Sequence, residues 1–80
     1  MIAAEEIERR IREEWPEADI NVNDLTGGAD HYQVDITTDA FEGKMSVARH
    51  RMVYALFNDV MGGALHALSL NTKTPAEAQG

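Results

Sequence analysis

Cysteine is absent from this sequence of 80 residues, and its absence limits the chemistry that the chain can perform. Disulfides, thiolate nucleophiles and cysteine-rich metal sites are all excluded. Any metal ligand from this chain must be a histidine or a carboxylate, and thiolate ligands must come from another molecule. The chain has three histidines, and no two of them have the i, i+4 spacing that places both on one helix face: His31, His50 and His66.

Long apolar runs are also absent. No stretch approaches the roughly 20 residues that cross a bilayer, and the start MIAAEEIERRIREEW lacks the basic and then apolar pattern of a signal peptide. The sequence therefore predicts a cytoplasmic protein without membrane contact. A hydrophobic content of 44% is typical of a globular chain. Residues 1–80 should form one small domain with a single core and no room for a deep active site.

Basic residues are scarce, and the formal net charge is −7. Residues 13–42 carry nine acidic side chains and neither lysine nor arginine, so this part of the chain should repel a phosphate backbone. The arginines of residues 9–12 each follow a glutamate by four positions, which predicts ion pairs on a helix face. One small basic group remains as a candidate anion contact: Lys44, Arg49 and Arg51.

Two segments have the apolar spacing of helices. In the first, apolar residues recur every four positions and Pro16 ends the pattern. The second begins at Ser46, a candidate N-cap, carries apolar residues at helical spacing as far as Met61, and ends at Gly62-Gly63. Near the C-terminus, Thr74 to Glu77 has the form of a capping box, which predicts at most one further helical turn.

Alternation of apolar and polar residues predicts three strands. Ile20 and Val22 alternate with asparagines, and residues 31–37 alternate so that His31 faces away from the core. A third strand follows from His66. Because a helical crossover separates the second and third strands, the third should run parallel to a neighbour. The predicted fold is an α+β two-layer αββαβ sandwich with a three-stranded mixed sheet.

Motifs of the common enzyme classes are missing. Neither serine lies in a G-x-S-x-G elbow, and neither Gly-Gly pair is followed by the lysine or further glycines of a nucleotide-binding loop. The acidic residues are plentiful, but no spacing selects two of them as an acid–base pair. The sequence therefore predicts a protein that is not an enzyme.

The residues alone leave the roles of the histidines open. His66 lies between Gly62-Gly63 and the third strand, where it fits a hydrogen-bonded residue at the core edge, a catalytic base or a metal ligand. His50 lies in Arg49-His50-Arg51 at a helix start. That group fits either a polar helix terminus or a basic contact patch for phosphate or an acidic protein.

Several runs of the sequence closely resemble the BolA family, in its order and at its spacing. They are D-H-Y-Q-V at 30–34, F-E-G at 41–43, R-H-R-M-V-Y at 49–54, L-H-A-L-S-L at 65–70 and T-x-T-P-A-E at 72–77. The resemblance covers essentially the whole chain. It implies a fold related to class II KH domains but without their G-x-x-G clamp, which agrees with the predicted αββαβ order.

The resemblance also implies a monothiol glutaredoxin as partner, in a heterodimer that shares a 2Fe–2S cluster. Glutaredoxin and glutathione would supply thiolates, and His66 corresponds to the family's ligand histidine. The family's second ligand, a cysteine or histidine in the loop between the first two strands, aligns with Gly28, which has no side chain to offer. His31, three residues further on, is the alternative ligand.

A second branch of the resemblance implies DNA binding and transcriptional control. The contact residues would be those of the basic group and the histidine within it: Lys44, Arg49, His50 and Arg51. The same surface would also suit a protein partner. Because only a few basic side chains gather there, DNA binding should be weak and sensitive to salt.

Overall fold

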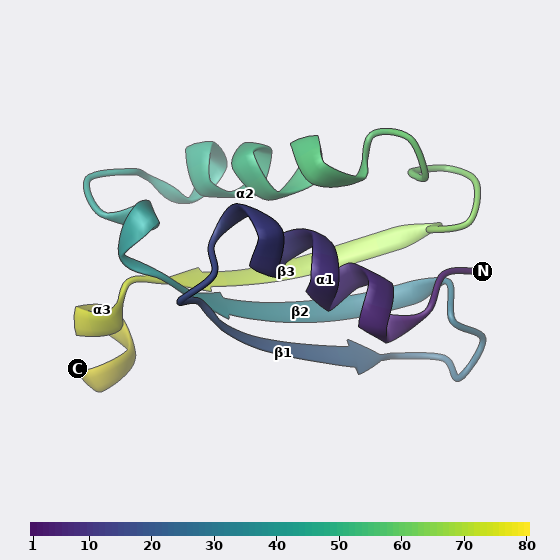
Figure 1. Cartoon of the computed structure of the whole chain (residues 1–80), viewed down its shortest axis with the longest axis horizontal. Coiled ribbons are helices and arrows are strands. Elements are labelled where there is room, and N and C mark those ends of the chain that lie inside the picture. Colours follow the sequence, from purple (N-terminus) through teal and green to yellow (C-terminus); the bar gives the residue numbers. More distant parts are fainter.

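The computed structural model describes residues 1–80 and has the predicted αββαβ order (Figure 1). A short C-terminal helix follows the last strand, and one 3-10 turn lies on each side of α2. None of the helices combines the length and the apolar character that crossing a bilayer requires. In chain order the elements are α1 (Ala4–Glu14), β1 (Asp19–Asp24), β2 (His31–Thr37), η1 (Asp39–Phe41), α2 (Ser46–Tyr54), η2 (Ala55–Phe57), β3 (Ala67–Lys73) and α3 (Pro75–Gln79).

The three strands form a mixed sheet in the order β1-β2-β3, as predicted. β1 and β2 are antiparallel, with Ile20 opposite Ile36, and β2 and β3 are parallel, with His31 beside Ala67. Parallel strands begin at the same edge of a sheet. The segment that leads into β3 therefore lies beside the start of β2, at the end of the molecule that also holds the β1–β2 loop (Figure 1).

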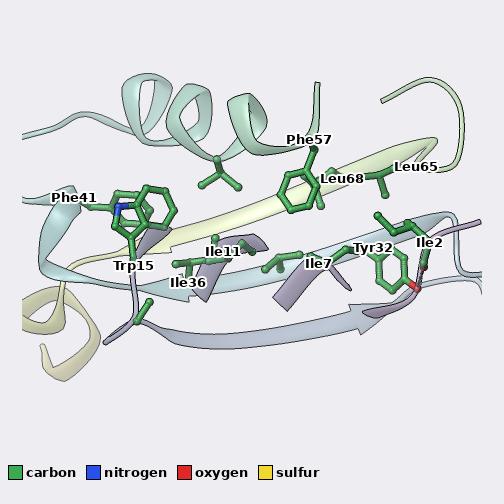
Figure 2. Close-up of a cluster of buried hydrophobic side chains, with 13 residues drawn as sticks. Ile2, Ile7, Ile11, Trp15, Tyr32, Ile36, Phe41, Phe57, Leu65 and Leu68 are labelled. Atoms are coloured by element: carbon green, nitrogen blue, oxygen red, sulfur yellow. Dashed lines mark hydrogen bonds between the residues drawn. The ribbon is translucent and has the colours of Figure 1, made fainter. Parts of the chain in front are cut away.

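The hydrophobic core lies between the helices and one face of the sheet (Figure 2). Alternate residues of β2 point into it, and Val34 is completely buried. The hydroxyl of Tyr32 donates a hydrogen bond of 2.6 Å to the carbonyl of Ile2, which satisfies its one polar atom inside the core. The other large contributions come from both long helices, η2 and the segment before β3: Ile7, Ile11, Val53, Phe57 and Leu65, each with no exposed surface.

Ion pairs account for the arginines of α1. Two of the pairs expected at i, i+4 form, from Arg10 to Glu6 at 2.9 Å and from Arg12 to Glu8 at 3.1 Å. Arg9 contacts Glu6 and Glu13 instead of the expected Glu5. Arg10 also reaches Asp59 at 2.7 Å, which ties α1 to the turn after α2. These arginines are therefore engaged on the helix face, as the sequence predicts.

Two details of the second predicted helix are wrong. Met45 occupies the N-cap position and Ser46 is already helical, so the serine does not cap. The α-helix also ends at Tyr54 rather than at Gly62, because the chain tightens into η2 and then turns back. The N–H of Leu65 bonds to the carbonyl of Val60 at 3.0 Å, and this turn returns Leu65 to the core.

The predicted capping box is confirmed. The hydroxyl of Thr74 accepts a hydrogen bond from the N–H of Glu77 at 3.2 Å, and the Glu77 carboxylate accepts one from the N–H of Thr74 at 2.8 Å. These bonds satisfy two of the free N–H groups at the start of α3. The helix that they begin extends to Gln79.

Two valines of α2 provide a matched test of this packing. Val53 has no exposed surface, whereas Val47 is 63% exposed on the same helix. We expect Val53→Ala to lower the free energy of unfolding by about 2 kcal/mol, because it removes buried methyl groups and leaves a cavity. Val47→Ala should change it by less than about 0.5 kcal/mol. Urea unfolding measures both, and equal effects would contradict the burial described here.

Candidate histidine site

Two histidines, His31 at the start of β2 and His66 just before β3, lie side by side at the end of the sheet where these strands begin. The rings of His31 and His66 are stacked, with centroids 5.8 Å apart and planes only 6° from parallel. Both remain accessible, since the side chain of His66 is 57% exposed and that of His31 is 40% exposed. As predicted, His31 points away from the core, on the opposite face from Tyr32. The third histidine, His50, is half-buried on α2.

One carboxylate faces both rings. Oδ1 of Asp30 lies 2.8 Å from Nδ1 of His31, and Oδ2 lies 3.4 Å from Nδ1 of His66. The first distance is that of a hydrogen bond, and the second is a longer polar contact. The His31 hydrogen bond is the main reason that the pKa of the Asp30 carboxyl is lowered. Because both Nδ1 atoms face Asp30, the Nε2 atom of each ring is turned away from it.

The main chain of the same aspartate fixes His66. The carbonyl of Asp30 accepts hydrogen bonds from the N–H groups of His66, at 2.8 Å, and of Ala67, at 3.2 Å. On the other side of the histidine, Leu65 is completely buried. The preceding turn depends on Gly62, whose φ of +84° is a conformation that side chains disfavour. His66 is thus held firmly by its backbone while its ring reaches solvent.

The β1–β2 loop that carries Asp30 is closed by another aspartate. The carboxylate of Asp24 accepts hydrogen bonds from the N–H groups of Thr26, Gly27 and Ala29, at 3.2, 2.9 and 3.0 Å. Such side-chain to main-chain bonds are typical of rigid turns. The loop therefore presents Asp30 in one position.

Gly28 lies in the tightest part of this loop. A Cβ atom at this position would come within 3.2 Å of Oδ1 of Asp30 and 3.4 Å of the Thr26 hydroxyl. The first distance is shorter than most real Cβ contacts, so any side chain here would crowd the carboxylate. The position aligned with a ligand in the BolA family thus offers none in this chain, and His31 is the histidine that lies nearest to His66.

The donor set fits part of a metal site. Histidines that bind a metal usually donate the other ring N–H to a carboxylate or carbonyl oxygen. His31 has this relation to Asp30, and Nδ1 of His66 faces the same carboxylate at 3.4 Å. No group of three or more histidine, cysteine, aspartate or glutamate side chains is arranged to hold a metal ion. The chain can therefore offer two imidazoles to a site whose other ligands belong to another molecule.

Arg49 does not belong to a surface patch, which corrects the expectation that it contacts DNA or a partner. It is only 8% exposed, and its guanidinium donates to Glu77 at 2.7 and 3.2 Å and to the carbonyl of Thr72 at 3.2 Å. It also lies over the ring of Phe41, 5.9 Å from the centroid. The arginine fastens α3 and β3 to α2.

The remaining basic group is small and distant from the histidine pair. Lys44 and Arg51 are exposed, and His50 is half-buried. Lys44 lies just before α2, and His50 and Arg51 lie in its middle and last turn, whereas β3 begins at the end of the molecule opposite to the start of α2 (Figure 1). A DNA contact built on these residues would use two fully charged side chains, which gives weak binding.

The surface clefts do not involve the histidines. Three clefts are present, and the residues around each of them are mainly carboxylates, hydroxyls, amides and the arginines of α1. None of them is lined by a histidine. The candidate site is therefore an exposed surface at the end of the sheet where β2 and β3 begin, rather than a pocket that encloses a substrate.

The fold is that of a family of small α+β domains. A family model described as BolA-like protein matches residues 7–77. This chain belongs to the BolA family, as the resemblance in its sequence implied.

Relatives in this family match the chain over different shares of their own length. The chain is 31% identical over 71 residues to the uncharacterized protein RP812 of Rickettsia prowazekii, covering 89% of this chain and 92% of that protein. It is 50% identical over 50 residues to SufE-like protein 1, chloroplastic/mitochondrial, of Arabidopsis thaliana, covering 62% of this chain but 14% of that protein. The chain thus corresponds to only part of some relatives. Since that name refers to organelles, the cytoplasmic location expected from the sequence stays a prediction.

Solved structures confirm the fold. The BolA domain of SufE1 from Arabidopsis thaliana superposes with a TM-score of 0.86 at 34% identity, over 96% of this chain and 99% of that one. BolA1 from the same organism gives a TM-score of 0.84 at 32% identity, over 92% and 93%. Yeast Fra2 gives 0.76 at 25% identity, over 96% and 84%.

The hydrogen bonds that the Asp24 carboxylate accepts should slow the opening of the β1–β2 loop. We expect Asp24→Ala to speed amide hydrogen exchange at Gly27 and Ala29 by roughly tenfold, because the N–H groups lose their acceptor. Asp19→Ala is the matched control, since Asp19 is exposed on the same strand and makes no side-chain hydrogen bond. Exchange rates that rise equally in both variants would show that Asp24 does not close the loop.

The Arg49–Glu77 ion pair predicts stability that depends on pH. The hydrogen bond from Arg49, followed by that from the N–H of Thr74, lowers the pKa of Glu77 from 4.5 to about 2. A carboxyl whose pKa is lower in the folded state stabilises the fold above its ordinary pKa and loses this effect as the pH falls through the lowered value. The contribution of Glu77 is therefore complete above pH 4.5 and declines toward pH 2.

We expect Glu77→Gln, which retains an oxygen for the capping box, to lower the urea midpoint at neutral pH. The difference from the unmodified protein should shrink as the pH falls through this window. Glu42→Gln, an exposed position, should change the midpoint little at either pH. If the urea midpoint of Glu77→Gln differs from that of the unmodified protein by the same amount at neutral pH and at the acid end of this window, the ion pair would be contradicted.

Proposed function

We propose that this chain is a non-enzymatic adaptor that pairs with a monothiol glutaredoxin and supplies histidine to a shared 2Fe–2S cluster. The observation that carries the proposal is the stacked pair of exposed histidines whose Nδ1 atoms face one carboxylate. Membership of the BolA family, one of whose domains occurs in SufE1, agrees with a role related to iron–sulfur chemistry. The process would be cluster trafficking or iron regulation.

His66 is the first ligand of this proposal. A neutral imidazole binds metal through the bare nitrogen of its ring while the other nitrogen keeps its proton. With Nδ1 of His66 facing Asp30, the nitrogen left for a metal is Nε2. The backbone hydrogen bond to Asp30 and the buried Leu65 hold the residue at a fixed point of the surface.

A partner is required because this chain cannot complete the ligand set. A 2Fe–2S cluster needs four ligands besides its bridging sulfides, and thiolates are the usual ones. This chain has no cysteine and can offer two imidazoles. Glutaredoxin and its bound glutathione would contribute the thiolates. The cluster would supply one-electron redox chemistry, at a potential that imidazole ligands raise.

His31 is the proposed second ligand from this chain. Gly28 has no side chain, and a Cβ atom at its position would already crowd the Asp30 carboxylate. His31 lies one residue beyond Asp30 on the rigid end of β2, with its ring beside that of His66. The partner would therefore dock against the end of the sheet that carries the β1–β2 loop and the start of β3 (Figure 1).

Spectroscopy of the mixed proteins tests the proposal. A monothiol glutaredoxin carrying a reconstituted 2Fe–2S cluster is mixed with this protein, and visible absorption and circular dichroism are recorded. We expect the spectrum to change on mixing, because replacing a thiolate by imidazole alters the charge-transfer bands of the cluster. His66→Ala should abolish the change, and His31→Ala should reduce it.

His50→Ala is the matched control, since His50 lies on α2 away from the histidine pair. It should give the spectrum of the unmodified protein. An unchanged spectrum on mixing the unmodified proteins would rule out the cluster role. Loss of the change in His50→Ala as well would show that the effect does not depend on the histidine pair.

A further inference from the structure

The carboxylate of Asp30 contributes little to closing the loop, because its one bond within the loop is from the Thr26 hydroxyl. Asp24 provides the carboxylate that closes the turn, by accepting from three main-chain N–H groups. The Asp30 side chain accepts no main-chain hydrogen bond at all. Its partners are the hydroxyl of Thr26, at 3.3 Å from Oδ1, and the two imidazoles. The half-buried charge is therefore directed at the histidines.

Asp30 contacts His66 in two independent ways. Its carbonyl fixes the backbone of His66 through a 2.8 Å hydrogen bond, and its Oδ2 lies 3.4 Å from Nδ1 of the same residue. Its other oxygen is already occupied by His31 and Thr26, so Oδ2 is the oxygen left for His66.

From these contacts we propose that Asp30 is a positioning residue, which selects the Nδ1–H form of His66 and so keeps Nε2 bare as the ligand atom. The inference rests on the proposed function, since it describes how the ligand nitrogen of that site is chosen. An ionised carboxylate can only accept, so it favours the ring form whose proton lies on the nitrogen that faces it. The same reasoning applies to His31, which shares the carboxylate.

Gly28 is part of this arrangement. A Cβ atom at position 28 would lie only 3.2 Å from Oδ1, so a side chain there would press on the carboxylate and shift it by a few tenths of an ångström. The glycine leaves the carboxylate free of this contact where it faces the Nδ1 atoms of the two rings.

The first test uses the free protein, without any cluster. Two-bond nitrogen–hydrogen correlation spectra report which ring nitrogen carries the proton, and they are recorded at about pH 8.5, where imidazoles are ordinarily neutral. We expect His66 to be mainly in the Nδ1–H form. In Asp30→Asn and Asp30→Ala its population should shift toward the Nε2–H form.

Asp35→Asn is the control for this experiment. Asp35 lies on the same strand and the same face as His31, but its side chain contacts Gln33 and neither histidine. The control should leave the proton of His66 on Nδ1.

Amide exchange at the His66 N–H shows whether each variant keeps the backbone hydrogen bond to the carbonyl of residue 30. A His66 ring that is mainly Nε2–H in the unmodified protein, or unaffected by both Asp30 variants, would overturn the proposal.

The second test uses the complex with the glutaredoxin and its cluster. Removing a negative charge that faces the ligand imidazole should raise the reduction potential in Asp30→Asn, whereas Asp35→Asn should change it less. The affinity for the cluster-loaded partner should fall by roughly 10- to 100-fold, as for other carboxylates behind ligand histidines. An unchanged potential and affinity would also overturn the role of Asp30.

The two experiments separate the two proposals. If the unmodified protein never alters the spectrum of the glutaredoxin cluster, the adaptor function fails, while the nitrogen spectra still decide what Asp30 does. If cluster sharing requires His66 but the ring form does not depend on Asp30, only the positioning role fails.

Discussion

The parallel pairing of β2 with β3 is the constraint on which the site depends. It pairs Ala67 with His31, so that the residue before β3, His66, meets the residue before β2, Asp30, whose carbonyl accepts the N–H groups of both His66 and Ala67. Main-chain hydrogen bonds of a sheet allow little adjustment, because a shift by one residue would move every buried side chain to the wrong face. The burial of β2 side chains therefore also holds the backbones of the two histidines beside one another.

The sequence predicted the fold well because its signals are periodic and local. Tyr32, Val34 and Ile36 alternate so clearly that the buried face of β2, and hence the outward direction of His31, follow from parity. The end of α2 was predicted too late, since Val60 and Met61 have helical spacing but serve a turn that returns Leu65 to the core. Periodicity records which residues are apolar and does not record the hydrogen bonds that interrupt a helix.

The site was only half predictable, for a related reason. His66 could be named from its motif, but its contact with His31 arises from strand pairing between distant segments, and no single stretch of sequence contains it. Asp30 carried no signal among nine acidic residues in its part of the chain. Arg49 was wrongly predicted to be a surface contact. Its place in a basic run does not reveal that Glu77, 28 residues further on, forms an ion pair with it.

The crowding around Gly28 has a consequence for how such loops change their chemistry. A single substitution at this position would add a potential ligand and, in the same step, press on the carboxylate that faces two others. That carboxylate would have to move by a few tenths of an ångström to make room. The effect of a new residue 28 therefore has two parts, the ligand that it adds and the shift that it imposes on the aspartate beside both histidines.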